Sequence, residues 1–279
     1  MPTTFTGRVA VVTGAGSGIG RALALELAAR GAKLSLSDIN EGTVQETAKL
    51  IEARGGEVIA DRLDTSDRAA WAAYAERVLD HYGVVNQLYN NAGVALGRSV
   101  EESTMEDYDR VLGINLLGVI CGTVTFLPHL IASGDGYVCN ISSLNGIMAQ
   151  PEMSHYVTSK FGVRGFTESL RMEMAVHGRP VGVSVVHPGG IKTNIATAEV
   201  EFAKAQGTAH PDAEKRLKLY NEKLLKMPPE QAARIICDGV AKRKMRILVG
   251  NDAKLMDLVE RTIPTQIHRG IVAFTRKLA

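Results

Sequence analysis

The amino-acid sequence predicts an α/β fold, in which one domain is built on a doubly wound parallel sheet with helices on both faces. Apolar runs rich in β-branched residues alternate with helical patterns along most of the 279 residues, as is typical of parallel strands joined by crossover helices. Glycines crowd the turn after the first run, and polar side chains follow several later runs. Ligands bind such sheets beyond the carboxyl ends of the strands, so these residues are expected to form the functional site.

About seven strands are expected, each on an apolar run. They are residues 8–13, 33–38, 56–64, 85–90, 136–143, 181–189 and 246–250. The pattern between the first two predicts a helix over residues 21–31, which ends at a glycine placed for a C-cap. The sequence contains no repeat and no low-complexity linker, so residues 1–279 are predicted to form a single domain.

Composition and charge indicate an ordinary globular protein. Hydrophobic residues make up 45% and charged residues 22% of the chain, and the net charge is +2, so neither overall disorder nor nucleic-acid binding is expected. Basic residues are in excess after Glu201, and the densest basic run is AKRKMR at 241–246. We interpret this run as a solvated helix end; contact of the basic C-terminal part with a membrane surface is the less favoured alternative.

Cysteine usage and the N-terminal sequence favour a cytoplasmic protein. Cys121, Cys139 and Cys237 show no paired spacing, which predicts reduced thiols and neither a disulfide framework nor a metal site. The N-terminal residues lack a basic region followed by a long apolar run, so no secretion signal is expected. Asn115 and three glycines interrupt the most apolar segment, residues 111–127, which predicts a buried helix and not a membrane span.

The turn after the first strand carries the pattern of a dinucleotide-binding loop. Gly14, Gly16, Gly18 and Gly20 lead from the strand into an amphipathic helix. Residues without a Cβ permit a tight turn and close approach to a phosphate, and a helix N-terminus offers N–H groups to a pyrophosphate. This pattern favours a Rossmann-type fold, although the spacing is not the common G-x-G-x-x-G fingerprint, and a purely structural turn is the alternative.

An acidic residue at the end of the second strand favours NAD over NADP. Asp38 lies 18 residues after Gly20, where a carboxylate can accept hydrogen bonds from the adenosine ribose and would repel a 2′-phosphate. Ser17 and Ile39 occupy the positions where a basic partner for that phosphate would be sought. The alternative is that Asp38 is the N-cap of the next helix.

Together with further motifs, these features resemble the short-chain dehydrogenases/reductases, over about residues 7–195. TGAGSGIG (13–20) resembles the cofactor loop of that family, NNAG (90–93) its signature after the fourth strand, and HPGGIKT (187–193) its proline-glycine segment. The residues that match the family's catalytic set, in the same order, are Asn115, Ser143, Tyr156 and Lys160. The resemblance implies an NAD(P)-dependent enzyme that interconverts alcohols and ketones.

The spacing of Tyr156 and Lys160 suits acid/base chemistry. Exchange of a hydride with an alcohol carbon requires a group that takes or gives the hydroxyl proton. A phenol has a pKa of about 10, too high for a base near neutral pH, but a neighbouring ammonium and a cationic nicotinamide ring favour the phenolate. Residues i and i+4 lie on one helical face, so Lys160 is predicted to activate Tyr156.

The other roles follow from the resemblance. Ser143, thirteen residues before Tyr156, would hold the substrate oxygen, and is preferred over Ser142 for that spacing. Asn115 would steady a water and the lysine in a proton relay, or alternatively is a satisfied core asparagine, and Lys160 would also bind the nicotinamide ribose. The residues implied to bind the cofactor are Gly14, Ser17, Gly18, Ile19, Gly20, Asp38, Asp64, Asn91, Gly93, Tyr156, Lys160, Pro188, Gly189, Ile191 and Thr193.

Substrate specificity is expected from three segments, 94–99, 144–153 and an insertion at about 194–227. The first two supply mainly apolar side chains, namely Val94, Leu96, Leu144, Met148 and Met153. This set predicts a hydrophobic, non-ionic secondary alcohol or ketone. The polar insertion is predicted to be a helical lid, and the tail at 251–279 to cover the pocket or to contact another subunit.

The leading hypothesis is therefore an NAD-dependent alcohol dehydrogenase or ketone reductase that forms a homo-oligomer, a tetramer or a dimer. An NADP-preferring carbonyl reductase is the alternative among enzymes. A nucleotide-sensing binding protein without turnover is the alternative from another class. The four matching catalytic residues argue against it, because a binding module needs no acid/base.

Overall fold

The computed structural model describes residues 5–208, 212–223 and 225–278. Within them, the strands form one parallel sheet in the order β3-β2-β1-β4-β5-β6-β7. The strands are β1 (Val9–Thr13), β2 (Lys33–Asp38), β3 (Val58–Arg62), β4 (Gln87–Asn90), β5 (Gly136–Ile141), β6 (Val181–Pro188) and β7 (Arg246–Val249). The expected α/β fold is thus confirmed, with strands up to four residues shorter than the apolar runs suggested.

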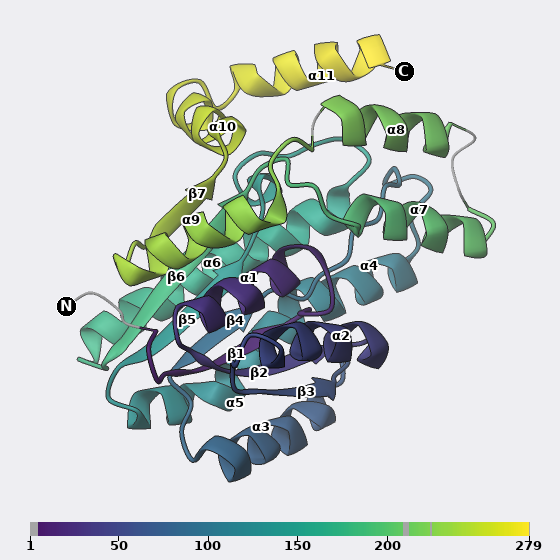
Figure 1. Cartoon of the computed structure of the whole chain (residues 1–279). Coiled ribbons are helices and arrows are strands. Elements are labelled where there is room, and N and C mark those ends of the chain that lie inside the picture. The colour runs from purple at the N-terminus through teal and green to yellow at the C-terminus, as the bar shows by residue number, and fades with distance from the viewer. Residues whose placement is uncertain (1–4, 209–211, 224, 279) are drawn as a thin grey trace.

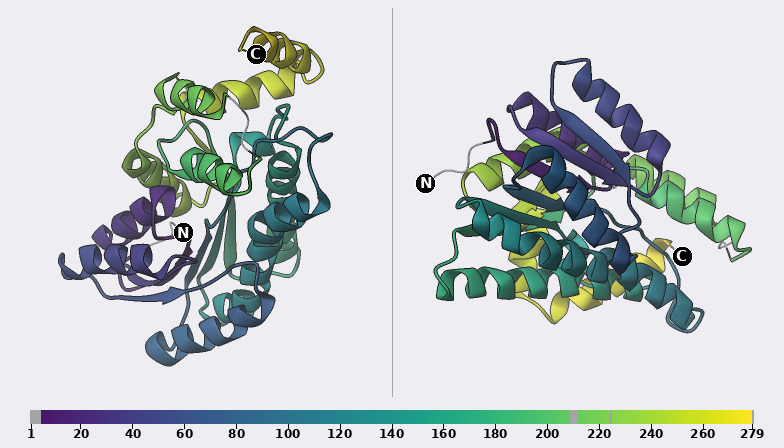
Figure 2. Two further views of the ribbon diagram at one scale, coloured as in Figure 1. Left: turned by 90° about the vertical axis from the view of Figure 1, so that its right-hand side faces the viewer. Right: turned by 90° about the horizontal axis from the view of Figure 1, so that it is seen from below.

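Helices cover both faces of the sheet (Figures 1 and 2). One face carries α1 (Gly18–Ala29), α2 (Glu41–Glu52) and α9 (Pro229–Ala241), and its core includes Leu23, Leu27 and Ile236. The other face carries α3 (Arg68–Tyr82), α5 (Gly118–Ala132) and α6 (Ser154–Val176), and its core includes Trp71, Phe126 and Leu170. Parallel strands covered on both sides are buried along their length, which is why their sequences are almost continuously apolar.

Local signals set the ends of several helices. The α1 helix ends at Ala29, and Gly31 follows in the left-handed conformation (φ +84°) that glycine adopts without strain. Asp67 caps α3 by accepting hydrogen bonds from the first helical N–H groups, and Gly83 (φ +70°) ends that helix. These ends fix how the chain returns to the next strand.

The apolar segment around Asn115 lies in a continuous helical run from Met105 to Ala132. It comprises α4 (Met105–Leu112), the π-helical turn Gly113–Leu117 and α5. By length and composition the run could cross a membrane, although 39% of its most apolar window is buried inside the protein. Core helices of soluble proteins share this property, and Val119, Phe126 and Leu130 of α5 are buried.

Four further helices follow β6 and β7. The expected insertion at 194–227 contains α7 (Ile195–Ala205) and α8 (Ala213–Lys223), while residues 209–211 and 224 fall outside the described part of the chain. The C-terminal tail forms α10 (Asn251–Thr262) and α11 (Gln266–Leu278), which lie together beyond the end of β7 (Figure 1).

Candidate functional site

The sequence-predicted residues gather at the carboxyl edge of the sheet. Most of them follow a strand: the glycine loop after β1, Asp38 at the end of β2, Asp64 after β3, Asn91 and Gly93 after β4. The serines follow β5 and the proline-glycine turn follows β6. The π-helical turn contributes Asn115, and α6 contributes Tyr156 and Lys160.

The glycine loop leaves space that side chains would fill. Gly14 and Gly18 have positive φ angles of +64° and +52°. A Cβ on Gly14 would lie 2.8 Å from the backbone of Ala92, and one on Gly20 would overlap the Gly14 carbonyl. The loop is therefore packed tightly against the segment after β4 while its N–H groups lead into α1, which fits a cradle for a pyrophosphate.

Asp38 is tied into this loop. Its Oδ2 accepts a hydrogen bond from Gly16 N at 2.9 Å, and its Oδ1 accepts one from Asn40 N at 3.0 Å. The cap of α2 is Asn40, whose side chain accepts from Thr43 N, so the alternative reading of Asp38 as that N-cap is wrong. Because Asn40 caps α2, Asp38 is not required as an N-cap. Its carboxylate lies at the end of β2 and is bound to the glycine loop.

Asn91 supports the loop from the next strand. Its Nδ2 donates to the carbonyl oxygens of Thr13 and Gly14 at 2.9 and 3.1 Å, and its own N–H donates to Thr13 Oγ1. The Asn91 side chain is thus bound to the loop backbone. The signature after β4 holds the glycine loop in place.

Tyr156 and Lys160 lie together one turn apart on α6. The Lys160 ammonium is 5.6 Å from the centre of the Tyr156 ring and donates to the Ile141 carbonyl at 3.1 Å. Lys160 is 4% exposed, and burial lowers its pKa to about 8. At neutral pH the amine is therefore still mostly charged, which is the state that favours a phenolate nearby.

The two serines after β5 differ in their partners. Ser142 is buried, and its hydroxyl donates to the Lys160 carbonyl at 2.8 Å. Ser143 is half-buried and caps the short 3-10 helix Leu144–Gly146 by accepting from Asn145 N. The hydroxyl proton of Ser143 therefore has no partner among the hydrogen bonds of the described residues, whereas that of Ser142 is engaged.

His187 contacts the same segment and was not predicted to be functional. It is fully buried at the end of β6, and its Nδ1 lies 2.8 Å from the Ser143 carbonyl oxygen. A carbonyl only accepts, so Nδ1 carries the proton. Burial lowers the pKa of His187 to about 4, which keeps the ring neutral. The sequence showed a histidine before Pro188, but nothing in it linked that ring to Ser143.

Asn115 is buried and fully hydrogen-bonded. Its Oδ1 accepts from Val94 N at 2.8 Å, and its Nδ2 donates to the Val94 carbonyl and to Ser159 Oγ. A Cβ on Gly93 would lie 3.2 Å from Asn115 Oδ1 and 3.5 Å from Lys160 Nζ. The backbone of Gly93 thus lies close to both the asparagine and the lysine, where a side chain would crowd them. The π-helical turn around Asn115 is of a kind often found at functional sites.

The remaining cofactor residues lie at the same edge. Asp64 accepts from the N–H and hydroxyl of Ser66 through Oδ1. Pro188 ends β6, Ile191 is buried, and a Cβ on Gly18 would meet Thr193 at 3.2 Å. The turn after β6 therefore comes within contact of the N-terminus of α1.

The apolar residues predicted to meet the substrate differ in exposure. Leu96 and Met148 are buried, whereas Val94, Leu144 and Met153 are half-buried. The 94–99 segment is paired with the residues before α6, since Arg98 N donates to the Glu152 carbonyl at 2.7 Å. This pairing holds the apolar segment beside the helix that carries Tyr156.

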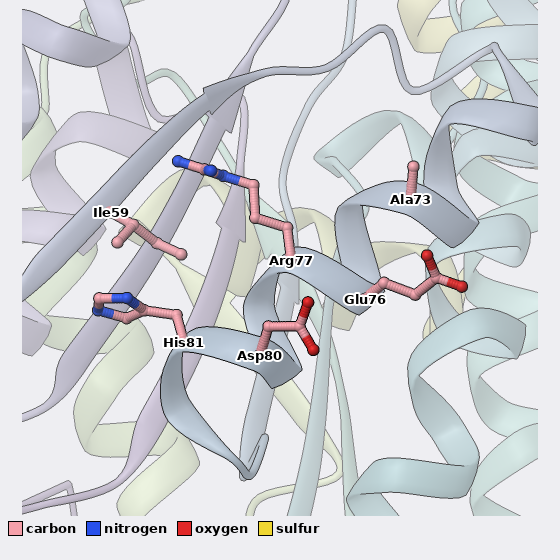
Figure 3. A pocket seen from close by; sticks show the side chains of 6 residues that line it. All are labelled: Ile59, Ala73, Glu76, Arg77, Asp80 and His81. Carbon is pink, nitrogen blue, oxygen red and sulfur yellow. The ribbon is translucent and has the colours of Figure 1, made fainter.

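The surface also has a hollow away from the predicted site. A hollow of about 520 Å³ lies between the start of β3 and the second half of α3 (Figure 3), lined by Ile59, Ala73, Glu76, Arg77, Asp80 and His81. No residue of the predicted site lines it. Among the described residues, no three His, Cys, Asp or Glu side chains gather as metal ligands.

Comparison with known proteins identifies the family. Residues 8–204 match the short chain dehydrogenase family. The chain belongs to the short-chain dehydrogenases/reductases. It is 46% identical over 276 residues to the Mycobacterium tuberculosis protein SadH, which is named as an oxidoreductase, with 99% of this chain and 98% of that protein covered.

Two further relatives bear on activity. A cyclohexanol dehydrogenase of Acinetobacter sp. is 36% identical over 74% of this chain and 80% of its own length. A short chain dehydrogenase/reductase from Burkholderia phymatum, solved in complex with NAD, superimposes with a TM-score of 0.85 at 32% identity, covering 95% of this chain and 96% of that one. This short-chain dehydrogenase/reductase is thus an NAD(P)-dependent oxidoreductase that acts on CH–OH or C=O groups.

Proposed function

We propose that this enzyme exchanges a hydride between NAD(H) and a hydrophobic, non-ionic secondary alcohol or its ketone. The observation that carries the choice of cofactor is the Asp38 carboxylate, which is fixed to the glycine loop at Gly16. A 2′-phosphate at this point would meet a negative charge. Arg21, a basic residue of nearby α1, is already engaged with Glu46 and the Thr43 carbonyl of α2, and Ile39 is apolar.

In the proposed mechanism Tyr156 is the acid/base. The hydroxyl proton of an alcohol passes to its phenolate, and the reverse step returns it. Lys160 stabilises the phenolate by its charge, and Ser143 donates a hydrogen bond to the substrate oxygen. Asn115 holds the backbone of Val94, accepting from its N–H and donating to its carbonyl. The hydride is exchanged with the nicotinamide, which is the chemistry that the cofactor supplies.

The proposal for the substrate rests on the apolar side chains of the segments 94–99 and 144–153. Val94, Leu144 and Met153 offer apolar surface, and the related cyclohexanol dehydrogenase is named for a non-ionic cyclic alcohol. We further propose that α7 is part of a lid. Glu199 of α7 accepts from Gly97 N at 3.0 Å, and the Arg110 guanidinium of α4 stacks on the Phe202 ring at 3.7 Å, so α7 is bound to the 94–99 segment and to α4.

A homo-oligomer is proposed from the exposed apolar side chains of α5 and α6. Leu117 at the end of the π-helical turn, Val124 on α5, and Phe161, Met172 and Val176 on α6 are all exposed, Val176 to 80%. Apolar side chains gathered on neighbouring helices favour association between subunits.

Thermal unfolding with NAD(H) or NADP(H), followed by activity on cyclohexanol and on a charged hydroxy acid, tests the proposal. A ligand at 100 times its dissociation constant adds about 2.7 kcal/mol to stability. We expect stabilisation by NAD(H), oxidation of cyclohexanol, and loss of turnover without loss of NADH binding in Tyr156→Phe. Stabilisation by NADP(H) alone, or activity confined to the hydroxy acid, would contradict it.

A further inference from the structure

The turn that follows β6 is held by the C-terminal part of the chain. Asp252, in the first turn of α10, accepts a hydrogen bond from Gly190 N through Oδ2 at 2.6 Å. Its Oδ1 accepts from its neighbour Ala253 N at 2.9 Å. Both carboxylate oxygens are therefore engaged, one with its own helix and one with the turn. Asp252 lies outside residues 8–204, which match the family.

Two glycines make room for this carboxylate. A Cβ on Gly189, after β6, or on Gly250, after β7, would overlap the carboxylate of Asp252. Gly250 has a positive φ of +108°, which by itself favours glycine, but Gly189 is not among the glycines with positive φ. The backbone conformation of Gly189 is therefore one that alanine could also adopt. A side chain is excluded at this position by the close carboxylate of Asp252.

The same turn is fixed on its other side by the end of the insertion. The Gly190 carbonyl accepts from Lys226 N and Met227 N, both at 3.1 Å, and Lys192 N donates back to the Met227 carbonyl. Gly190 is thereby held through its N–H by Asp252 and through its carbonyl by the insertion. Close behind Gly190 come Ile191 and Thr193, which by the family resemblance match positions that hold the nicotinamide carboxamide.

We propose that Asp252 is a positioning residue for the nicotinamide half of the cofactor. Its carboxylate fixes the Gly189–Gly190 peptide and so the place of Ile191 and Thr193. This inference rests on the proposed function, because it takes the turn after β6 to be a nicotinamide contact. The adenosine half lies at Asp38 and the glycine loop, which have no hydrogen bond to Asp252 among the described residues.

The test compares two ligands that differ only in the nicotinamide ring. NADH contains the ring, whereas ADP-ribose lacks it, and the dissociation constants of both are measured by calorimetry. Asp252→Ala should weaken NADH binding by about five- to tenfold, the net value of one typical hydrogen bond, and should change ADP-ribose binding by less than twofold. Asp252→Asn keeps one oxygen for Gly190 N and should fall in between. The exposed neighbour in the same turn provides the matched control Asn251→Ala, which should change neither.

A second variant tests the contact itself. Gly189→Ala should weaken NADH in the wild-type background, because the methyl group would displace Asp252. In the Asp252→Ala background the same change should cost little more, since the overlap is gone. Such non-additivity is the sign of a direct contact.

The outcomes separate this inference from the function on which it rests. Wild-type protein that binds neither NADH nor ADP-ribose would overturn the proposed function and the inference with it. Wild-type protein that binds both, with Asp252→Ala weakening the two equally or weakening neither, would overturn the positioning role alone. Additive losses in the double variant would likewise refute the contact between Gly189 and Asp252.

Discussion

The buried His187 should make the stability of this enzyme fall in mild acid. Burial is the main cause that lowers its pKa to about 4; nearby Arg246 and Arg164 act in the same direction, while the Ser143 carbonyl and Asp257 oppose it. In the unfolded chain a histidine titrates near 6.5. Below that pH the unfolded state binds a proton that the folded state does not, so the free energy of unfolding falls as the pH falls from about 6.5 to about 4.

The size of this effect follows from the two pKa values. A difference of about 2.5 units corresponds to about 3.4 kcal/mol in total, of which about 2 kcal/mol is lost by pH 5. The free energy of unfolding is measured by urea denaturation between pH 7 and pH 5 in wild type and in His187→Asn. An asparagine amide can donate to the Ser143 carbonyl in place of Nδ1 but does not titrate. We therefore expect the free energy of unfolding to fall more steeply in the wild type than in the variant, in which buried His155, whose pKa is also lowered by burial, still contributes; parallel slopes would refute the assignment of this loss to His187.

Three other changes have expected outcomes that follow from single contacts. Gly20→Ala should lower the free energy of unfolding by about 2 kcal/mol, the cost of overpacking, and should weaken NADH binding, because the methyl group would overlap the glycine loop. The control is Gly165→Ala, where a Cβ would meet open space. In the same urea and NADH titrations this variant should be neutral or slightly more stable. Asp38→Ser combined with Ile39→Arg should turn the ratio of kcat/KM for NAD over NADP in favour of NADP, and an unchanged ratio would contradict the role of Asp38. Glu199→Ala should raise the KM for cyclohexanol several-fold with little change in kcat, since it removes the hydrogen bond that holds α7 to the apolar segment; equal KM values would argue against a lid.

The fold could be predicted from the sequence because its main signals are local. Seven apolar runs gave seven strands, and Gly31 ended α1 as its position suggested. The edges were less exact, since the strand expected over 56–64 spans only Val58–Arg62. An apolar run indicates which residues are buried. The ends of a strand, in contrast, are set by the extent of its hydrogen bonding to the neighbouring strand. That neighbour is distant in sequence, so the run alone does not define it.

The candidate site could be predicted as a set of residue types but not as a set of contacts. Tyr156 and Lys160 share a helix, so their proximity follows from spacing. The partners that hold the surrounding loops come from elsewhere. Asn91 binds the glycine loop from the next strand, Asp252 reaches the turn after β6 from 62 residues further along the chain, and His187 binds Ser143 across 44 residues. No periodicity or motif records such pairs, because they exist only once the sheet brings the strand ends together.

The burial of Lys160 links these loops to the chemistry. The ammonium has one hydrogen bond in the described structure, to the Ile141 carbonyl, and desolvation lowers its pKa to about 8. At pH 7 the charged form of Lys160 outnumbers the neutral form by about ten to one, whereas about one pH unit above its pKa most of the lysine is neutral. Alcohol oxidation releases a proton and is favoured at high pH, whereas support for the Tyr156 phenolate requires a charged lysine. The two demands oppose each other above pH 8, so the burial of Lys160 also sets the upper end of the pH range in which its charge can assist the acid/base.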